Sequence, residues 1–211
     1  DYRDGTIKKI LLSLSKFSFI KYRPPFGDTP GFLALHDEMR YMISKFCLSS
    51  YDPQEYKRSR WTESVIEYYS NELAKENLDT EMQNLQLEQL HYMLYLKTQD
   101  GWNRAKVLFE KADDHRDIEF MEAINQECSS FKDDLDDRQR IEYKLHLGVV
   151  KHKREQYLEA IGILKDATKR IIDDESLRLA VVGRLITLYA DIGQPAQAVR
   201  LGLQEVKRWN T

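Results

Sequence analysis

The sequence is poor in the residues that build tight turns and disulfide frameworks. It holds 9 Gly, 5 Pro and 2 Cys among 211 residues. So few glycines and prolines leave little material for the turns of an all-β sandwich, so we expect a mostly helical protein. Cys47 and Cys128 have no CxxC partner and no adjacent histidine, which predicts unpaired thiols in a reducing compartment and no structural zinc.

Long apolar runs are also missing. The most apolar stretch, Ile10 to Ile20, is interrupted by Ser13, Ser15 and Lys16, whereas a membrane span needs about 18 uninterrupted apolar residues. The first twenty residues have no secretion signal. With 42% hydrophobic and 32% charged residues, we expect a soluble cytoplasmic protein without membrane contact. Because residue 1 is Asp rather than Met, we expect a piece of a longer chain.

The net charge of −3 conceals an acidic middle. Residues 51–134 carry 10 Lys/Arg against 19 Asp/Glu, whereas residues 135–211 carry 14 against 11. An acidic segment repels phosphates and attracts basic surfaces, although most such charge is only the solvated side of amphipathic helices. A dedicated nucleic-acid binder is therefore disfavoured.

Motifs for catalysis and metal binding are absent from the sequence. The five histidines are not paired at the i, i+4 spacing, and the acidic cluster Asp133–Asp137 lacks the layout of a calcium loop. Neither a G-x-S-x-G elbow nor a GxxxxGK[ST] loop occurs. We predict no metal, no cofactor and no catalytic residue in this chain, and we interpret the acidic cluster as helix capping before Arg138.

The first fifty residues predict a helix, a hairpin and a helix. Apolar residues at helical spacing cover 6–16, β-prone runs cover 17–23 and 32–36 around a Pro- and Gly-rich loop, and Asp37 is placed to cap a further apolar helix. This order is that of the back half of a winged-helix domain. We therefore assign residues 1–50 to the C-terminal part of such a domain.

The stretch LSKFSFIKYRPPFGDTPGFLALHDEMRYMISKFC resembles the winged-helix segment of STAND-class signalling ATPases of the NB-ARC and NACHT type. Leu35-His36-Asp37 matches their "Leu-His-Asp" tripeptide, and Arg40 matches the arginine that follows it. The resemblance implies that His36, with Asp37, senses nucleotide by contacting the β-phosphate of ADP. It also implies an upstream nucleotide-binding domain that holds ADP or ATP, because this chain has no P-loop.

Two other interpretations of this segment stay open. His36 can simply hydrogen-bond the local backbone at a strand end. A winged helix can also bind DNA through its first helix, although Lys8, Lys9 and Lys16 are few and the predicted face is apolar.

The rest of the chain predicts helical hairpins. Residues 51–78 form a linking helix that starts near Pro53, and residues 79–211 resemble tetratricopeptide repeats. Ala160, Leu164 and Ala167 share the spacing of Ala105, Phe109 and Ala112, and Ala198 repeats it 38 residues after Ala160. Asp117 to Phe131 is an additional helix between degenerate repeats. The resemblance implies a right-handed α-superhelix.

These features predict the sensor of a STAND-type ATPase, which recognises a protein or peptide ligand and oligomerises on activation. The expected first helices are 85–96, 138–153 and 177–192, and they line the concave side of the stack. Basic residues there predict a ligand groove for an acidic segment: Arg140, Lys144, Lys151, Arg178 and Arg184. These residues can instead be only a solvated face. The alternative functions are a tetratricopeptide scaffold without nucleotide control and a winged-helix transcription regulator.

Overall fold

The structure is a computed structural model that describes residues 20–23, 32–35, 56–74, 82–96, 98–171 and 174–209. The chain divides into two compact units, Asp1–Arg60 and Trp61–Thr211. Outside one short hairpin the described elements are helices, which confirms a mostly α protein. Among the described residues, no helix combines the length and apolarity that crossing a membrane would require.

The first unit contains a two-stranded antiparallel hairpin. Strand β1, Ile20–Arg23, pairs with strand β2, Phe32–Leu35, so that Ile20 lies opposite Leu35. The strands lie within the two β-prone runs of the sequence. The helices expected on either side, together with His36 and Asp37, lie outside the described residues. The winged helix therefore stays a prediction, and so do the boundaries at residues 50 and 78.

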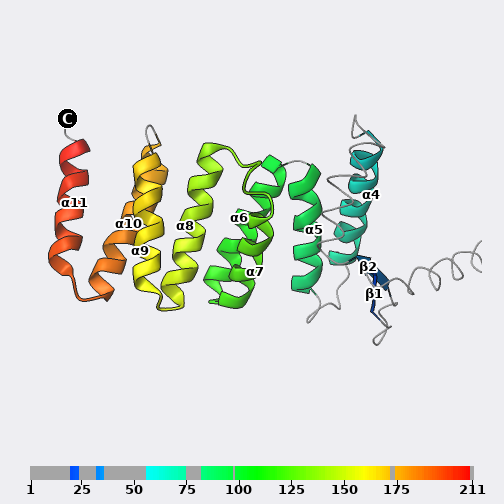
Figure 1. The fold of residues 1–211 in the computed structure, drawn as a ribbon, viewed down its shortest axis with the longest axis horizontal. Coiled ribbons are helices and arrows are strands. Elements are labelled where there is room, and N and C mark those ends of the chain that lie inside the picture. The colour runs from blue at the N-terminus through cyan, green and yellow to red at the C-terminus, as the bar shows by residue number, and fades with distance from the viewer. Residues whose placement is uncertain are drawn as a thin grey trace, which may run out of the picture. The chain divides into compact units, whose positions relative to one another are not determined.

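The second unit is a succession of antiparallel helices (Figure 1). From α5 to α11 they lie side by side in a row, and each packs on the next or on the one after it. The bounds are α4 Tyr56–Leu73, α5 Met82–Leu96, α6 Thr98–Asp114, α7 Ile118–Ser129, α8 Asp137–Lys153, α9 Tyr157–Arg170, α10 Glu175–Asp191 and α11 Pro195–Trp209.

One turn geometry recurs in three of the helix pairs, α6/α7, α8/α9 and α10/α11. Two residues after the last residue of each first helix comes a residue with positive φ, which is Arg116 (57°), Glu155 (60°) or Gly193 (71°). The next residue donates its backbone N–H to the carbonyl five positions earlier, at 2.8, 2.9 and 2.8 Å respectively. This is the Schellman closure of a helix. The three pairs are therefore copies of one local unit.

The helix bounds repeat with the turns. Helix α8 begins 39 positions after α6, and α10 begins 38 positions after α8, with equal lengths of 17 residues. The spacing of 38 between Ala160 and Ala198 is thus confirmed. The alignment of Ala105 with Ala160 is wrong, because it places α6 among the second helices. The turn at Arg116 makes α6 a first helix, and α7 is its partner rather than an additional helix.

Aspartates cap the N-termini of three helices, α7, α8 and α10. Asp136 accepts from the backbone N–H of Gln139 at 2.8 Å, and Gln139 returns a bond to the backbone of Asp136. Asp117 and Asp174 accept from Phe120 N and Leu177 N at 3.0 and 2.9 Å. These bonds satisfy N–H groups that the first turn leaves free. They confirm that carboxylates before Arg138 cap a helix.

The core consists of two clusters that meet at α8. Trp102 and Ile124 are fully buried in the first cluster, Leu164 and Val181 in the second, and Leu145 packs against both. Cys128 is a buried free thiol of the first cluster, and desolvation raises its pKa to about 12. A thiol with this pKa is protonated and inert at neutral pH.

At the contact between paired helices, a glycine on one helix faces a large aliphatic residue on the other, and the two hairpins place the glycine on opposite helices. In α8/α9, a Cβ added at Gly148 would lie 2.7 Å from Leu164 Cδ2. In α10/α11, the equivalent residues are Ile186 and Gly202, and a Cβ added at Gly202 would lie 3.8 Å from Ile186 Cδ1. Each hairpin thus fills the same space with one aliphatic side chain, carried by the opposite helix.

Candidate functional site

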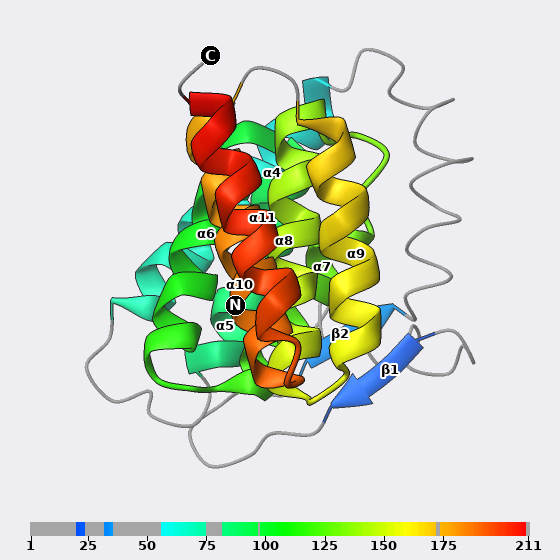
Figure 2. The same cartoon turned by 90° about the vertical axis from the view of Figure 1, so that its left-hand side faces the viewer.

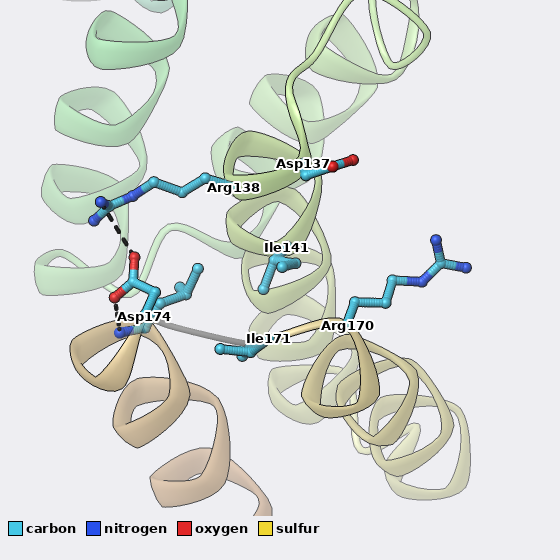
Figure 3. A pocket seen from close by; sticks show the side chains of 7 residues that line it. Asp137, Arg138, Ile141, Arg170, Ile171 and Asp174 are labelled. Atoms are coloured by element: carbon cyan, nitrogen blue, oxygen red, sulfur yellow. Dashed lines mark hydrogen bonds and ion pairs between the residues drawn. The ribbon is translucent and has the colours of Figure 1, made fainter.

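A hollow of about 310 Å³ opens where α8, the end of α9 and the start of α10 meet. Figure 3 shows Ile141 and Ile171 between two arginines, with Arg138 on one side and Arg170 on the other. Ile141 and Ile171 are buried, as is Leu177, which also lines the hollow. The site therefore combines an apolar floor with a charged rim.

Arg138 is held in place on its side of the rim. Its Nη1 lies 3.2 Å from Asp174 Oδ2, and its Nε lies 3.3 Å from Glu142 Oε1. The hydrogen bond to Glu142 is the main reason why the pKa of Arg138 is raised. Asp174 also caps α10 through Leu177 N. The Asp174 carboxylate thus caps the N-terminus of α10 and also orients the guanidinium of Arg138 (Figure 3).

Glu142 ties this rim to the preceding hairpin. It is 8% exposed and accepts from Trp102 Nε1 at 2.5 Å, while Lys106 Nζ lies 3.5 Å from the same carboxylate. A buried carboxylate is retained as an anion only when such partners compensate its desolvation. Arg138 is therefore positioned by a network that crosses from α6 to α8.

Arg170 is the less constrained cation of the rim. Its Nε lies 3.4 Å from Asp166 Oδ2, and its side chain is 60% exposed. Asp166 is shared with Lys144, whose hydrogen bond is the main cause of the lowered pKa of Asp166. Exposed ion pairs of this kind contribute little to stability, because solvent screens the two charges. Arg170 can therefore turn toward an anion with little loss.

The five cations predicted to line one groove are already paired within the chain. Arg140 lies 3.4 Å from Asp137, Lys151 lies 2.8 Å from Glu159, and Lys144 pairs with Asp166. Arg178 donates two bonds to Glu205 at 2.8 and 2.6 Å, and Arg184 lies 3.5 Å from Asp113. Their positive charge is thus largely compensated before any ligand arrives.

Four of these five residues share one helix face: Arg140, Lys144 and Lys151 lie at the i, i+4 and i+11 positions of α8, and Arg178 holds the position of Arg140 on α10. Lys144 and Lys151 reach toward α9, and Arg178 reaches toward α11, the second helix of its own pair. Arg184 reaches in another direction, to Asp113 on α6, where Lys153 also lies 2.5 Å from the carboxylate. Arg184 therefore lies apart from the other four residues, and the basic ligand groove stays a prediction.

The predicted nucleotide-sensing residues His36 and Asp37 lie outside the described residues, so the structure does not place them. Sequence reasoning missed Arg138, Arg170 and Asp174 as members of one site. Arg138 and Asp174 lie at the starts of α8 and α10, and the spacing of 38 could have indicated that these two helix starts are neighbours.

A second hollow of about 490 Å³ lies among α4, α5 and α6. Gln89 donates to Ser70 Oγ at 2.9 Å across it, and Arg104 lines it with a buried Nε that has no hydrogen-bond partner. Burial lowers the pKa of Arg104. In the described part of the chain, no group of three His, Cys, Asp or Glu side chains could hold a metal ion.

No protein family, curated protein or solved structure matches this chain.

Proposed function

We propose that this chain recognises a protein or peptide segment through its array of helical hairpins. The observation that carries the proposal is the recurrence of one hairpin, with the same turn and nearly the same spacing, in α6/α7, α8/α9 and α10/α11. Stacked copies of one unit build an extended surface, and such surfaces suit extended protein ligands.

The hollow between α8 and α10 is the proposed contact point. Ile141, Ile171 and Leu177 offer an apolar floor for an aliphatic side chain. Arg170 is exposed and weakly paired at the rim, so it can bind a neighbouring carboxylate. The ligand chemistry is therefore an aliphatic residue beside an acidic one, on an extended segment.

Binding of labelled peptides tests this proposal. The probes are synthetic peptides with a central Leu flanked by Asp, and the same peptides flanked by Lys. We expect Arg170→Glu to weaken binding of the acidic peptide at least fivefold, whereas Lys169→Glu, on the next exposed cation of α9, leaves it unchanged. Equal loss in both variants would indicate general electrostatics and would contradict a site at the hollow.

The finer proposal is that ligand recognition controls a nucleotide switch of the STAND type in the cytoplasm. It is supported by the tripeptide Leu35-His36-Asp37 and by the order of winged helix and repeats in the sequence. ADP or ATP is held by a nucleotide-binding domain outside this chain, and His36 contacts the β-phosphate. We further propose that the activated protein oligomerises.

Nucleotide exchange separates this switch from a scaffold without nucleotide control. In the protein that includes its nucleotide-binding domain, we expect His36→Ala to release ADP faster than the parent protein. Unchanged release would remove His36 from the mechanism and favour the scaffold. Specific binding of duplex DNA by the same protein would favour a transcription regulator instead.

A further inference from the structure

Helix α11 carries an apolar stripe on the side that faces away from the rest of the array. Figure 2 looks onto this helix from the end of the row, and no described helix lies in front of it. The stripe consists of large side chains that are 57 to 61% exposed: Val199, Leu203, Val206 and Trp209. Leu179 on the neighbouring helix α10 is 43% exposed. So many exposed apolar side chains on one terminal hairpin indicate an interaction surface.

Three of the five equivalent positions one hairpin earlier are covered, whereas Leu203 and Val206 correspond to Lys165, which is exposed, and Thr168, which is half-buried. Helices α8 and α9 begin 38 positions before α10 and α11, so Val199, Trp209 and Leu179 correspond to Ile161, Ile171 and Ile141. These three isoleucines are only 7, 6 and 5% exposed. They share a core cluster with Leu177 and Val181, because α10 packs on α9.

The apolar face of α10 therefore shows which shape fits such a surface. Its buried aliphatic residues include Leu177, Val181 and Leu188, at the i, i+4 and i+11 positions of one helix face. Helix α10 covers this surface on α9. The equivalent surface on α11 is not covered by any helix in the described part of the chain. The fitting occupant is thus an amphipathic helix with an aliphatic stripe.

The charge of α11 indicates which charged residues should lie beside the aliphatic stripe of the bound helix. Helix α11 carries Arg200, Lys207 and Arg208 but a single acid, Glu205, and Arg208 lies 3.1 Å from Glu175 of α10. Glu205 is 8% exposed and is already bound by Arg178. A second copy of α11 on this stripe would bring two basic flanks together, which is unfavourable. Acidic flanks are complementary.

We propose that the outer face of α10/α11 binds an amphipathic helix of a partner protein, with an aliphatic stripe and acidic flanks, in the way that α8/α9 receives α10. This face is separate from the hollow at Arg170, so either proposal can fail alone. Val199, Leu203 and Val206 lie at the i, i+4 and i+7 positions of one face of α11, which is the spacing that lets a partner helix pack alongside it.

A peptide with the sequence of α10 is the probe. A labelled peptide of residues 174–191 is titrated with the whole chain, and fluorescence anisotropy reports binding. We expect Val199→Asp and Val206→Asp each to weaken binding at least tenfold. Leu158→Asp is the matched control, because Leu158 is an 82% exposed aliphatic residue of α9 away from the stripe; it leaves binding unchanged.

A second peptide tests the acidic flanks. It carries Arg178→Glu and Arg184→Glu, and we expect it to bind several-fold more tightly than the first at low salt, with the difference lost at high salt. Weaker binding of this peptide would overturn the assignment of acidic flanks.

Three outcomes would overturn the proposal as a whole. The first is no detectable binding by either peptide. The second is binding that is insensitive to Val199→Asp and Val206→Asp, because the peptide would then replace α10 itself. The third is a peptide-independent dimer in sedimentation that Val206→Asp abolishes, because the occupant would then be a second copy. A monomeric chain that binds the peptide through the stripe supports the proposal.

Discussion

Gly101 lies where the backbones of α5 and α6 meet. A Cβ at this position would lie 2.5 Å from the backbone N of Leu94 and 2.7 Å from the carbonyl carbon of Met93. Backbone atoms cannot move aside as a side chain can, so the two helices would have to separate. The absence of a side chain at Gly101 is thus a condition of this helix contact.

We predict that Gly101→Ala lowers the free energy of unfolding by about 2 to 4 kcal/mol, as overpacking of a tight contact does. Gly162→Ala is the control, because nothing lies within 4 Å of a Cβ added to that helical glycine. There alanine should stabilise by up to about 1 kcal/mol. Urea denaturation measures both. A neutral Gly101→Ala would contradict the close approach of α5 and α6.

The turn residues at positive φ differ in their cost. Glu155 has φ 60° and Gly193 has φ 71° in equivalent turns. The left-handed conformation costs a residue with a Cβ about 1 kcal/mol, whereas glycine adopts it freely. We predict that Glu155→Gly stabilises and that Gly193→Ala destabilises, each by about 1 kcal/mol in thermal or urea unfolding. A destabilising Glu155→Gly together with a stabilising Gly193→Ala would contradict the left-handed conformation of these two turns.

His146 makes stability depend on pH. Its ring stacks on Phe109 at 4.0 Å and on Trp102 at 5.7 Å between centroids, and its Nδ1 is buried without a partner. Desolvation lowers its pKa from 6.5 to about 4. The unfolded chain therefore binds the proton first as pH falls, so the folded state loses stability between pH 6.5 and 4.

We predict that this loss reaches roughly 3 kcal/mol at pH 4. His146→Phe keeps a stacked ring but removes the titration, so its free energy of unfolding should fall less between pH 6.5 and 5 than that of the parent chain. Urea denaturation at a series of pH values measures the difference. Parallel pH profiles for both proteins would contradict a buried neutral His146.

At the scale of the elements, each hairpin depends on complementary sizes across its two helices. Gly148 faces Leu164 in α8/α9, and Ile186 faces Gly202 in α10/α11. Leu164 is fully buried, so shortening it leaves a cavity. The pair, rather than either residue, is the unit that packs.

Double-mutant analysis of Gly148 and Leu164 tests this complementarity. We predict that Leu164→Ala costs about 2 to 5 kcal/mol and that Gly148→Ala is also destabilising. The double variant should cost less than the two single variants together by about 1 kcal/mol or more, because the added methyl group occupies part of the space that Leu164 vacates. Simple additivity would contradict direct contact between the two positions.

At the scale of the whole molecule, the buried clusters belong to one unit. Both core clusters are formed by residues between Leu87 and Leu201, inside the unit Trp61–Thr211. A unit that contains its own core is able to fold alone. Leu145 contacts both clusters, so the hairpins are expected to unfold together rather than one after another.

We predict that a fragment of residues 56–211, which starts at the first residue of α4, folds without the preceding segment. Its helical circular dichroism signal should disappear in one cooperative thermal transition, within a few degrees of the helical transition of the full chain. A fragment that lacks such a transition would show that the array needs residues 1–55.

Apolar periodicity and capping residues are enough to place α8 and α10 along the chain. The expected first helices 138–153 and 177–192 correspond to α8 and α10 within two residues, and the spacing of 38 is the true repeat. Apolar periodicity and capping aspartates act within one helix, so they can be interpreted without knowing the neighbours. The winged-helix assignment of the segment around His36 stays a prediction, because His36 lies outside the described residues.

Which helices pair, and which charged side chains are left to bind a ligand, depends on the tertiary packing. The turns at Arg116 and Glu155 carry no glycine signal, so the place of α6 as a first helix emerged from backbone geometry. Arg184 meets Asp113 from 71 positions away, which no local pattern predicts. Periodicity assigns a residue to a face of its own helix, but what that face contacts depends on how the helices pack against one another.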